Sequence, residues 1–319
     1  MIRSQTPVQP FVRFCGMEFS YGRRTQPSEA PIKPGLAAGN RIREDIEYLH
    51  HDGRPIIMRL FRPLGSGPFP AVIDLHGGCW SKGDLNECQP CDEVLAEAGI
   101  AAAALDFRHA GDGYPTSLID INYAIRWLKA HAKELRIDPQ RIGITGKSSG
   151  GHLAMLAAMR PHDPRYASIA LEGGGEGIDA SVQCVGMLWP VINPLSRYRN
   201  ALRARQQAEP PAWVGDLPER HHLYWGTEEA MAEGNPVLAL ETGESVLTPP
   251  AFWVQGKPDP VHDYRDPDSP LDLNEPERFA ADYRKAGGDI EVLYIDQDQR
   301  ATRASYDPMA AFLQRHLLP

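Results

Sequence analysis

The chain has 319 residues, enough for one large domain or two small ones. Hydrophobic residues make up 42% of the chain and charged residues 24%, which is typical of a soluble protein with a sizeable core. The formal net charge of −9 argues against nucleic acid or an anionic membrane as the main partner, because both require a basic face.

Targeting and membrane-spanning signals are not found in the sequence. No apolar run reaches the roughly 18 residues that cross a bilayer, and the first 35 residues lack the apolar segment of a secretory signal. The five cysteines are few and odd in number, which favours a reducing, cytoplasmic location. Cys88 and Cys91 have CxxC spacing without a second pair, so we expect two ordinary thiols at a helix start. We therefore expect no metal and no cofactor.

In chain order, residues 1–40 are rich in Pro and Gly and are expected to form an extended N-terminal arm. Two strand-like runs then flank His51-Asp52-Gly53-Arg54, which is a hairpin signal. Beyond the hairpin, short apolar runs alternate with helical patterns. We expect strands at 43–50, 56–62, 70–75, 100–107, 141–145, 182–189, 251–255 and 290–295, and helices at 86–98, from Pro115 onward, and at 151–159, 277–285 and 308–316.

This alternation predicts the fold class: α/β, with a mostly parallel central sheet and helices on both faces. Ligand sites of such sheets lie beyond the carboxyl ends of the strands. Residues 41–319 are expected to form one domain, in which 190–248 breaks the rhythm and is expected to be a cap insertion over the site. The aromatic residues of this insertion either line an apolar substrate pocket or pack the cap against the body, and both interpretations stay open.

A Gly-x-Ser-x-Gly turn, Gly146 to Gly150, lies between an apolar run and a helical pattern. The backbone must turn sharply from strand to helix there, which requires small residues two positions before and after the serine. Ser148 would then lie at a helix N-terminus, where the helix dipole favours developing negative charge. The pattern predicts that Ser148 is a nucleophile for acyl transfer.

A second loop, His76-Gly77-Gly78, directly follows another predicted strand. The backbone N–H groups of the two glycines, together with that of Ser149, are expected to form an oxyanion hole. An ordinary glycine turn is the alternative. We expect His76 to brace this loop.

These two motifs occur together with Phe107-Arg108-His109-Ala110, Asp138-Pro139-Gln140-Arg141-Ile142 and Gln255-Gly256-Lys257-Pro258-Asp259-Pro260-Val261. In this combination, residues 40–319 resemble the α/β-hydrolase fold, and more narrowly its esterase and lipase branch related to hormone-sensitive lipase and small bacterial carboxylesterases. Kynurenine formamidase-like enzymes share the H-G-G-x-W form of the loop that ends at Trp80. The resemblance implies Ser148 as nucleophile, Gly77, Gly78 and Ser149 as the oxyanion hole, and Asp259 as the triad acid. It also implies a small ester or acyl substrate and an association into homodimers.

The histidine of this family would lie in the loop 296–303, yet the chain has none between His262 and His316. A serine hydroxyl is a poor nucleophile unless a base accepts its proton. We therefore expect a displaced base and take His262, on the loop of Asp259, as the candidate. The alternatives are His109, His221 and His222, whereas His152, His316 and Lys147 are expected to have other roles.

Two functions remain open at this point. The first is a serine-dependent hydrolase of carboxylic esters that uses Ser148, Asp259 and His262, with Trp80, Trp189 and Trp225 contacting the substrate. The second is a pseudo-hydrolase that binds a ligand or runs non-hydrolytic chemistry in the same pocket. In that case Arg300 or Arg303 would hold a ligand carboxylate, unless their loop is simply solvated.

Overall fold

The computed structural model describes residues 36–38, 41–172, 175 and 177–318. Most of the predicted N-terminal arm therefore lies outside the described residues. Its last part differs from the prediction, since Leu36–Ala38 form strand β1, which pairs antiparallel with β2. The pairing starts the sheet earlier than the sequence pattern indicated.

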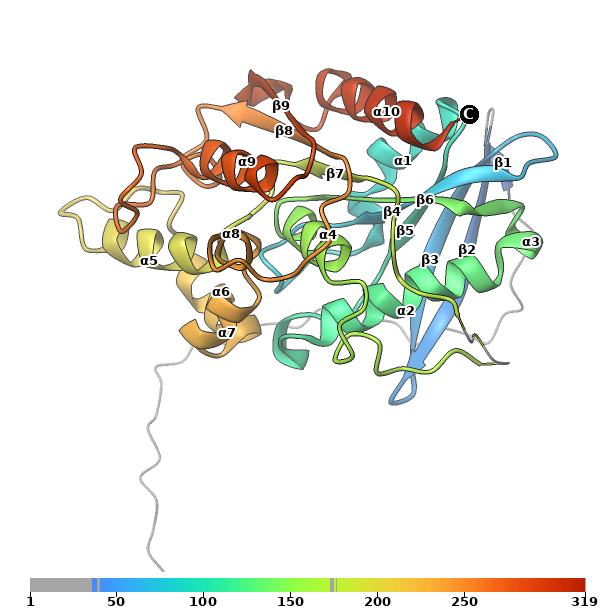
Figure 1. Cartoon of the computed structure of the whole chain (residues 1–319), viewed down its shortest axis with the longest axis horizontal. Coiled ribbons are helices and arrows are strands. Elements are labelled where there is room, and N and C mark those ends of the chain that lie inside the picture. Colours follow the sequence, from blue (N-terminus) through green and yellow to red (C-terminus); the bar gives the residue numbers. More distant parts are fainter. Residues whose placement is uncertain (1–35, 39–40, 173–174, 176, 319) are drawn as a thin grey trace, which may run out of the picture. The chain divides into compact units, whose positions relative to one another are not determined.

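The described residues form one sheet of nine strands in the order β1-β2-β3-β5-β4-β6-β7-β8-β9 (Figure 1). The strands β4 to β9 run parallel to one another, whereas β1, β2 and β3 are antiparallel additions at the edge next to β5. The bounds are β2 (Arg41–His51), β3 (Arg54–Pro63), β4 (Phe69–Leu75), β5 (Ala101–Leu105), β6 (Ile137–Lys147), β7 (Val185–Leu188), β8 (Ala251–Lys257) and β9 (Ile290–Asp296). The predicted fold class is confirmed.

Helices cover both faces of the sheet (Figure 1). They are α1 (Gln89–Glu97), α2 (Thr116–Ala130), α3 (Ala132–Leu135), α4 (Ser149–Met159), α5 (Pro194–Arg205), α6 (Leu217–Trp225), α7 (Glu228–Glu233), α8 (Pro236–Glu241), α9 (Glu275–Lys285) and α10 (Arg303–Leu317). Three short 3₁₀ turns, η1 (Leu85–Glu87), η2 (Ala110–Asp112) and η3 (Gln297–Gln299), follow strands or precede helices.

The core consists of two layers, because successive side chains of a strand point to opposite faces. In β4, Ala71 and Ile73 pack into the cluster that holds α2, α4 and α9, while Val72 packs with α1 and α10. All three side chains have no exposed surface. Burial on both faces explains the continuous apolar runs from which these strands were predicted.

The predicted elements agree with the observed ones except at a few ends. The largest difference is α10, which begins at Arg303 rather than near Pro308. The Thr302 side chain accepts a hydrogen bond from the Ala304 N–H and caps the helix there. Pro308 thus lies inside the helix.

Between β7 and β8 the chain forms α5 to α8, which gather at one end of the sheet (Figure 1). Helix α6 contacts η2, which follows β5, and α8 contacts α4. This is the segment in which we expect the cap, and its function as a cap stays a prediction.

Candidate active site

Ser148 lies at the sharp turn between β6 and α4 and has φ 53° and ψ −118°. Backbone in this region is strained by about 1–3 kcal/mol and persists only where its surroundings hold it. Two hydrogen bonds do so: the Ser148 N–H donates to the Leu188 carbonyl at 2.9 Å, and the Val191 N–H donates to the Ser148 carbonyl at 3.0 Å. The side chain is half-buried at the N-terminus of α4.

The glycines of the turn are required by close backbone contacts. A Cβ on Gly146 would lie 2.5 Å from the Gly150 carbonyl carbon, and one on Gly150 would lie 2.2 Å from the Leu75 carbonyl oxygen. The turn therefore packs directly against the end of β4, the strand that leads into His76-Gly77-Gly78.

A hydrogen-bonded chain of three side chains starts at this serine. Ser148 Oγ lies 3.0 Å from His262 Nε2, and His262 Nδ1 lies 2.8 Å from Asp259 Oδ2. Both His262 and Asp259 are buried. Serine, imidazole and carboxylate thus stand in the order required for removing the serine proton.

The carboxylate of Asp259 is held by three further contacts. Its Oδ2 accepts hydrogen bonds from Arg300 Nη1 at 2.8 Å and from Gln255 Nε2 at 3.2 Å. Its Oδ1 accepts one from the Val261 N–H at 3.1 Å. Gly256 leaves room for Arg300, since a Cβ there would lie 2.8 Å from the Arg300 Cδ. These contacts fix the carboxylate in the plane it needs to orient His262.

The pKa values of the pair follow from burial and charge. Burial acts to raise the pKa of Asp259, but the hydrogen bond from His262 and the charges of His262 and Arg300 outweigh it and lower the value. Burial lowers the pKa of His262, Asp259 raises it, and Arg197 and Arg300 lower it, with a net decrease. Neutral His262 is therefore favoured, which is the state that accepts a proton.

The contacts of Arg300 and Arg303 do not favour the alternative in which one of them holds a ligand carboxylate. Arg300 binds Asp259, and its guanidinium also lies over the Trp189 ring at 5.0 Å. Arg303 forms ion pairs with Glu97 and Asp307. Carboxylates of the chain itself already occupy both guanidinium groups.

The loop after β4 has the features expected of an oxyanion hole. Gly78 has φ 107°, and a Cβ there would lie 2.0 Å from the Lys82 carbonyl oxygen. A Cβ on Gly77 would lie 3.4 Å from the Ser148 Cβ, so this loop runs directly beside the serine. Among the described residues, the N–H groups of Gly77, Gly78 and Ser149 have no hydrogen-bond acceptor. They are available to a ligand oxygen.

The other histidines considered at the sequence level are engaged elsewhere. His76 Nδ1 donates to the Gly77 carbonyl at 2.8 Å and the ring stacks on Phe107, so His76 braces the loop as predicted. Burial lowers its pKa to about 4. His109 Nε2 lies 3.4 Å from the Gly83 carbonyl. His221 contacts Arg197 and the Leu217 carbonyl, while the remaining histidine of that pair, His222, is exposed on α6.

All three predicted substrate-binding tryptophans are buried, and Trp189 is 7% exposed. Trp80 is 1% exposed and Trp225 is 3% exposed, and their ring centroids lie 5.3 Å apart. Trp80 Nε1 donates to His152 Nδ1 at 3.2 Å, and His152 Nε2 lies 2.7 Å from the Gly234 carbonyl after α7. These contacts join the α5–α8 segment to the body, as the packing interpretation expects. Substrate contact by Trp80, Trp189 or Trp225 stays a prediction.

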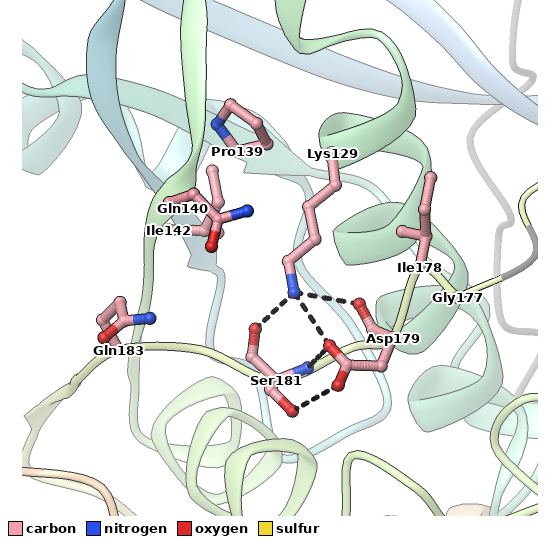
Figure 2. Close-up of a pocket in the computed structure, with 9 residues that line it drawn as sticks. All are labelled: Lys129, Pro139, Gln140, Ile142, Gly177, Ile178, Asp179, Ser181 and Gln183. Carbon is pink, nitrogen blue, oxygen red and sulfur yellow. Dashed lines mark hydrogen bonds and ion pairs between the residues drawn. The ribbon is translucent and has the colours of Figure 1, made fainter.

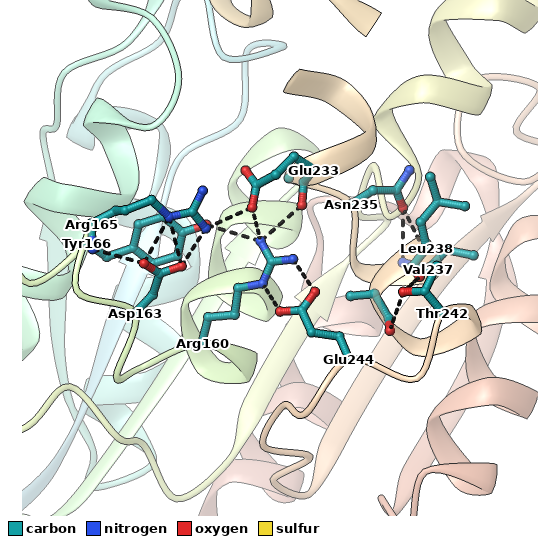
Figure 3. A network of polar contacts seen from close by, with 12 residues as sticks. Arg160, Asp163, Arg165, Tyr166, Glu233, Asn235, Val237, Leu238, Thr242 and Glu244 are labelled. Carbon is teal, nitrogen blue, oxygen red and sulfur yellow. Dashed lines mark hydrogen bonds and ion pairs between the residues drawn. The ribbon is translucent and has the colours of Figure 1, made fainter. Parts of the chain in front are cut away.

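The same segment is fastened to the far end of α4 by ion pairs (Figure 3). Arg160 follows α4 and binds Glu233 at 2.9 Å and Glu244 at 2.6 Å. Arg165 binds Glu233 and Asp163. Helix α4 therefore carries the serine at its start and a charged link to α7 at its end.

A separate surface pocket lies at the opposite edge of the sheet (Figure 2). Ile142 lines it and precedes Ser148 by six residues of β6, which places the pocket roughly 20 Å from the serine. Its cation, Lys129, donates to the Ser181 carbonyl and binds Asp179. Lys129, Asp179 and Ser181 bind one another, which makes this pocket a weaker site candidate than the Ser148 cluster.

Comparison with known proteins identifies the family of the chain. The BD-FAE family model matches residues 59–266, well over half of the chain. The chain belongs to the BD-FAE family. Its residues Ser148, Asp259 and His262 all fall within the matched region.

Curated relatives of the chain are esterases. It is 31% identical over 196 residues to the probable carboxylic ester hydrolase LipM of Mycobacterium tuberculosis, covering 61% of this chain and 42% of the relative. It is also 31% identical over 147 residues to ethyl acetate hydrolase of Pseudomonas putida, covering 44% and 46%. The match thus spans less than half the length of each of these relatives.

Solved structures share the fold over nearly the whole length. The metagenomic carboxylesterase EstE1 has a TM-score of 0.67 at 22% identity, covering 90% of this chain and 92% of that one. A bacterial heroin esterase has a TM-score of 0.67 at 20% identity, with 89% and 87% covered. The central domain is an α/β-hydrolase fold.

Two negative findings apply to the described part of the chain. None of its helices has the length and apolar character needed to cross a membrane. Nor does any group of three or more His, Cys, Asp or Glu side chains in it form a metal site.

Proposed function

We propose that the protein is a serine-dependent hydrolase of carboxylic esters, with Ser148 as nucleophile, His262 as displaced general base and Asp259 as the acid that orients it. The observation that carries this proposal is the 3.0 Å separation of Ser148 Oγ and His262 Nε2, continued by the 2.8 Å contact of His262 Nδ1 with Asp259. The esterase relatives support the same reaction class.

The first half-reaction transfers the acyl group to the enzyme. Ser148 Oγ attacks the ester carbonyl carbon while His262 Nε2 takes the hydroxyl proton. The carbonyl oxygen becomes an oxyanion that receives hydrogen bonds from the N–H groups of Gly77, Gly78 and Ser149. The bond to the alkoxy oxygen then breaks, and His262 returns the proton to the departing alcohol.

The second half-reaction releases the acid. His262 removes a proton from a water molecule, whose oxygen attacks the acyl carbon. Collapse of this second tetrahedral intermediate breaks the bond to Ser148 Oγ, which regains its proton from His262. Because Asp259 also binds Arg300, it remains ionised throughout and stabilises the imidazolium.

Hydrolysis of p-nitrophenyl acetate and butyrate, together with labelling by a fluorophosphonate, tests the proposal. We expect both esters to be cleaved and Ser148 to be labelled. Ser148→Ala should lower kcat by about 10⁴-fold or more and abolish labelling, because the residual rate rests on binding and the oxyanion hole alone.

The pseudo-hydrolase alternative makes the opposite prediction. A wild-type protein that cleaves neither ester and takes no phosphonate would contradict our proposal. The control is Ser181→Ala, whose hydroxyl donates to Asp179 in the pocket of Figure 2, far from Ser148, and which is expected to leave labelling of Ser148 intact.

A further inference from the structure

A buried arginine without a carboxylate partner lies beside His262. Arg197, on α5, is 2% exposed. Its Nε donates to His221 Nε2 at 3.3 Å, its Nη2 to Cys79 Sγ at 3.1 Å, and its guanidinium lies 5.3 Å from the centre of the Trp80 ring. Among the described residues, no Asp or Glu lies within ion-pair distance of it.

The groups that hold Arg197 are all neutral. His221 Nδ1 lies 2.8 Å from the Leu217 carbonyl and donates to it, which leaves Nε2 as an acceptor for Arg197. Burial lowers the pKa of His221 well below its usual value and raises the pKa of the Cys79 thiol. Because a guanidinium stays protonated in proteins, Arg197 carries a positive charge that no carboxylate of the described residues contacts directly, although the charge of Asp259 acts on it from beyond ion-pair distance.

Other buried arginines of the same region are compensated. Arg160 binds two glutamates at the end of α4 (Figure 3), and Arg278 binds Glu241 at 2.7 Å and Glu275 at 3.4 Å. Removing a charge from water without a partner is costly. Arg197 differs from these two arginines in having no directly bound carboxylate, which leaves it able to bind an anion from outside the chain.

Arg197 also faces the right place for a substrate group. It lines a narrow gap, without room for a water molecule, together with His262, Tyr264, Asn193 and Glu275. Val191, whose N–H binds the Ser148 carbonyl, belongs to the same wall. Nη1 of Arg197 has no hydrogen-bond partner among the described residues. Binding of a ligand group there would require the walls of the gap to move apart.

Glu275 also lines this gap and is the acidic side chain there, but it already has partners within the chain. Its carboxyl accepts from Asn193 Nδ2 at 3.2 Å and faces Arg278. Burial raises its pKa to about 7 against the effect of Arg278. Its repulsion of an incoming anion is therefore weakened, while Arg197 remains unpaired.

We propose that the ester substrate carries a carboxylate, and that this carboxylate pairs with Arg197 in the gap beside His262. The inference rests on the proposed hydrolase function and narrows its substrate class. A guanidinium can bind a carboxylate through two parallel hydrogen bonds, and Nη1 of Arg197 is a free donor for one of them. The carboxylate belongs either to the acyl part or to the alcohol part of the ester.

Two matched pairs of esters test this in a pH-stat assay at pH 7.5. For the acyl part, monomethyl glutarate is compared with methyl 5-methylhexanoate, which replaces the carboxylate by an isopropyl group. For the alcohol part, acetoxyacetate is compared with isobutyl acetate in the same way. We expect the charged ester of one pair to have the higher kcat/KM, by about 10-fold or more, and the pair concerned identifies which part Arg197 binds.

Arg197→Met should lower kcat/KM for that charged ester by about 100-fold while changing the neutral esters by less than about 3-fold. Arg197→Lys should restore part of the preference. The matched control is Arg199→Met, on the same helix but paired with Glu228 at the surface, which should keep the preference. Equal losses on all four esters in Arg197→Met, or no preference in the wild type, would overturn the inference.

A binding measurement separates this inference from the proposed function. Ser148→Ala lacks the nucleophile, so calorimetry can follow the binding of the intact charged esters to it. We expect binding that disappears when Arg197→Met is added. Cleavage of p-nitrophenyl esters without such binding would refute the inference alone, whereas Arg197-dependent binding without any hydrolysis would refute the hydrolase function alone.

Discussion

Two neighbouring loops at the carboxyl edge of the sheet contribute unequally to the candidate site. The loop after β8 supplies both the acid, Asp259, and the base, His262. The loop after β9 supplies Arg300, which binds the same carboxylate. Lys257 at the end of β8 is paired with Asp296 at the end of β9, so the two loops start side by side. Position at this edge, rather than order along the chain, decides which side chains reach Ser148.

The local geometry of the loop after β8 explains how this loop supplies both the acid and the base. The N–H groups of His262 and Asp263 both donate to the Asp259 carbonyl, at 3.3 and 2.8 Å. This is one helical turn, and residues three apart on such a turn lie on the same face. Acid and base therefore meet without help from a second loop.

The largest effect is expected from removing the base. His262→Ala should lower kcat for p-nitrophenyl butyrate by about 10⁴-fold, because Ser148 then loses its proton acceptor. His222→Ala, on the exposed face of α6, is the control and should leave kcat unchanged. Equal activity of the wild type and His262→Ala would show that another group acts as the base.

Asp259→Asn should come next, with a decrease in kcat of about 10³- to 10⁴-fold. The amide can donate to His262 Nδ1 and hold the imidazole in the wrong tautomer. It also leaves Arg300 without its carboxylate. Steady-state kinetics of this variant, with circular dichroism to show that it folds, checks the prediction. A small effect would mean that Gln255 and Arg300 organise the loop without the acid.

Much of this arrangement follows from the sequence. The serine turn, the glycine loop and Asp259 each follow a predicted strand, and parallel strands end at one edge. His262 was one of several candidate bases, and its spacing of three residues from Asp259 was the available signal. That spacing becomes decisive only when the loop is known to form a helical turn.

The roles of the arginines could not be predicted in the same way. Arg197 appears in the sequence as part of an amphipathic basic helix, and its burial depends on how α5 packs on Trp80 and His221. Arg300 reaches Asp259 because Gly256, on the neighbouring strand, leaves space for its side chain. Both facts depend on contacts between segments distant in the sequence, which local patterns do not encode. The same is true of Trp80 and Trp225, whose burial among aromatic rings follows from tertiary packing.

The smallest effect on activity is expected from a substitution in the loop after β9. Arg300→Gln removes a positive charge that lowers the pKa of His262, while Asp259, which raises that pKa, stays in place. The pKa of His262 should therefore rise. Since only neutral His262 accepts the serine proton, activity falls as pH decreases through this pKa, and the acidic limb of kcat/KM should move to higher pH. At pH values above this limb, kcat/KM should fall by about 10-fold or less, because Ser148, His262 and Asp259 all remain.

A profile of kcat/KM between pH 4.5 and 9 measures this shift. Arg303→Gln is the matched control, because Arg303 lies in the same region but binds Glu97 and Asp307 at the surface. Its acidic limb should coincide with that of the wild type. A limb that moves to lower pH in Arg300→Gln would mean that Arg300 acts mainly by holding Asp259 in place. In that case loss of Arg300 weakens the hydrogen bond and the charge by which Asp259 raises the pKa of His262. The main role of the loop after β9 would then be to position Asp259.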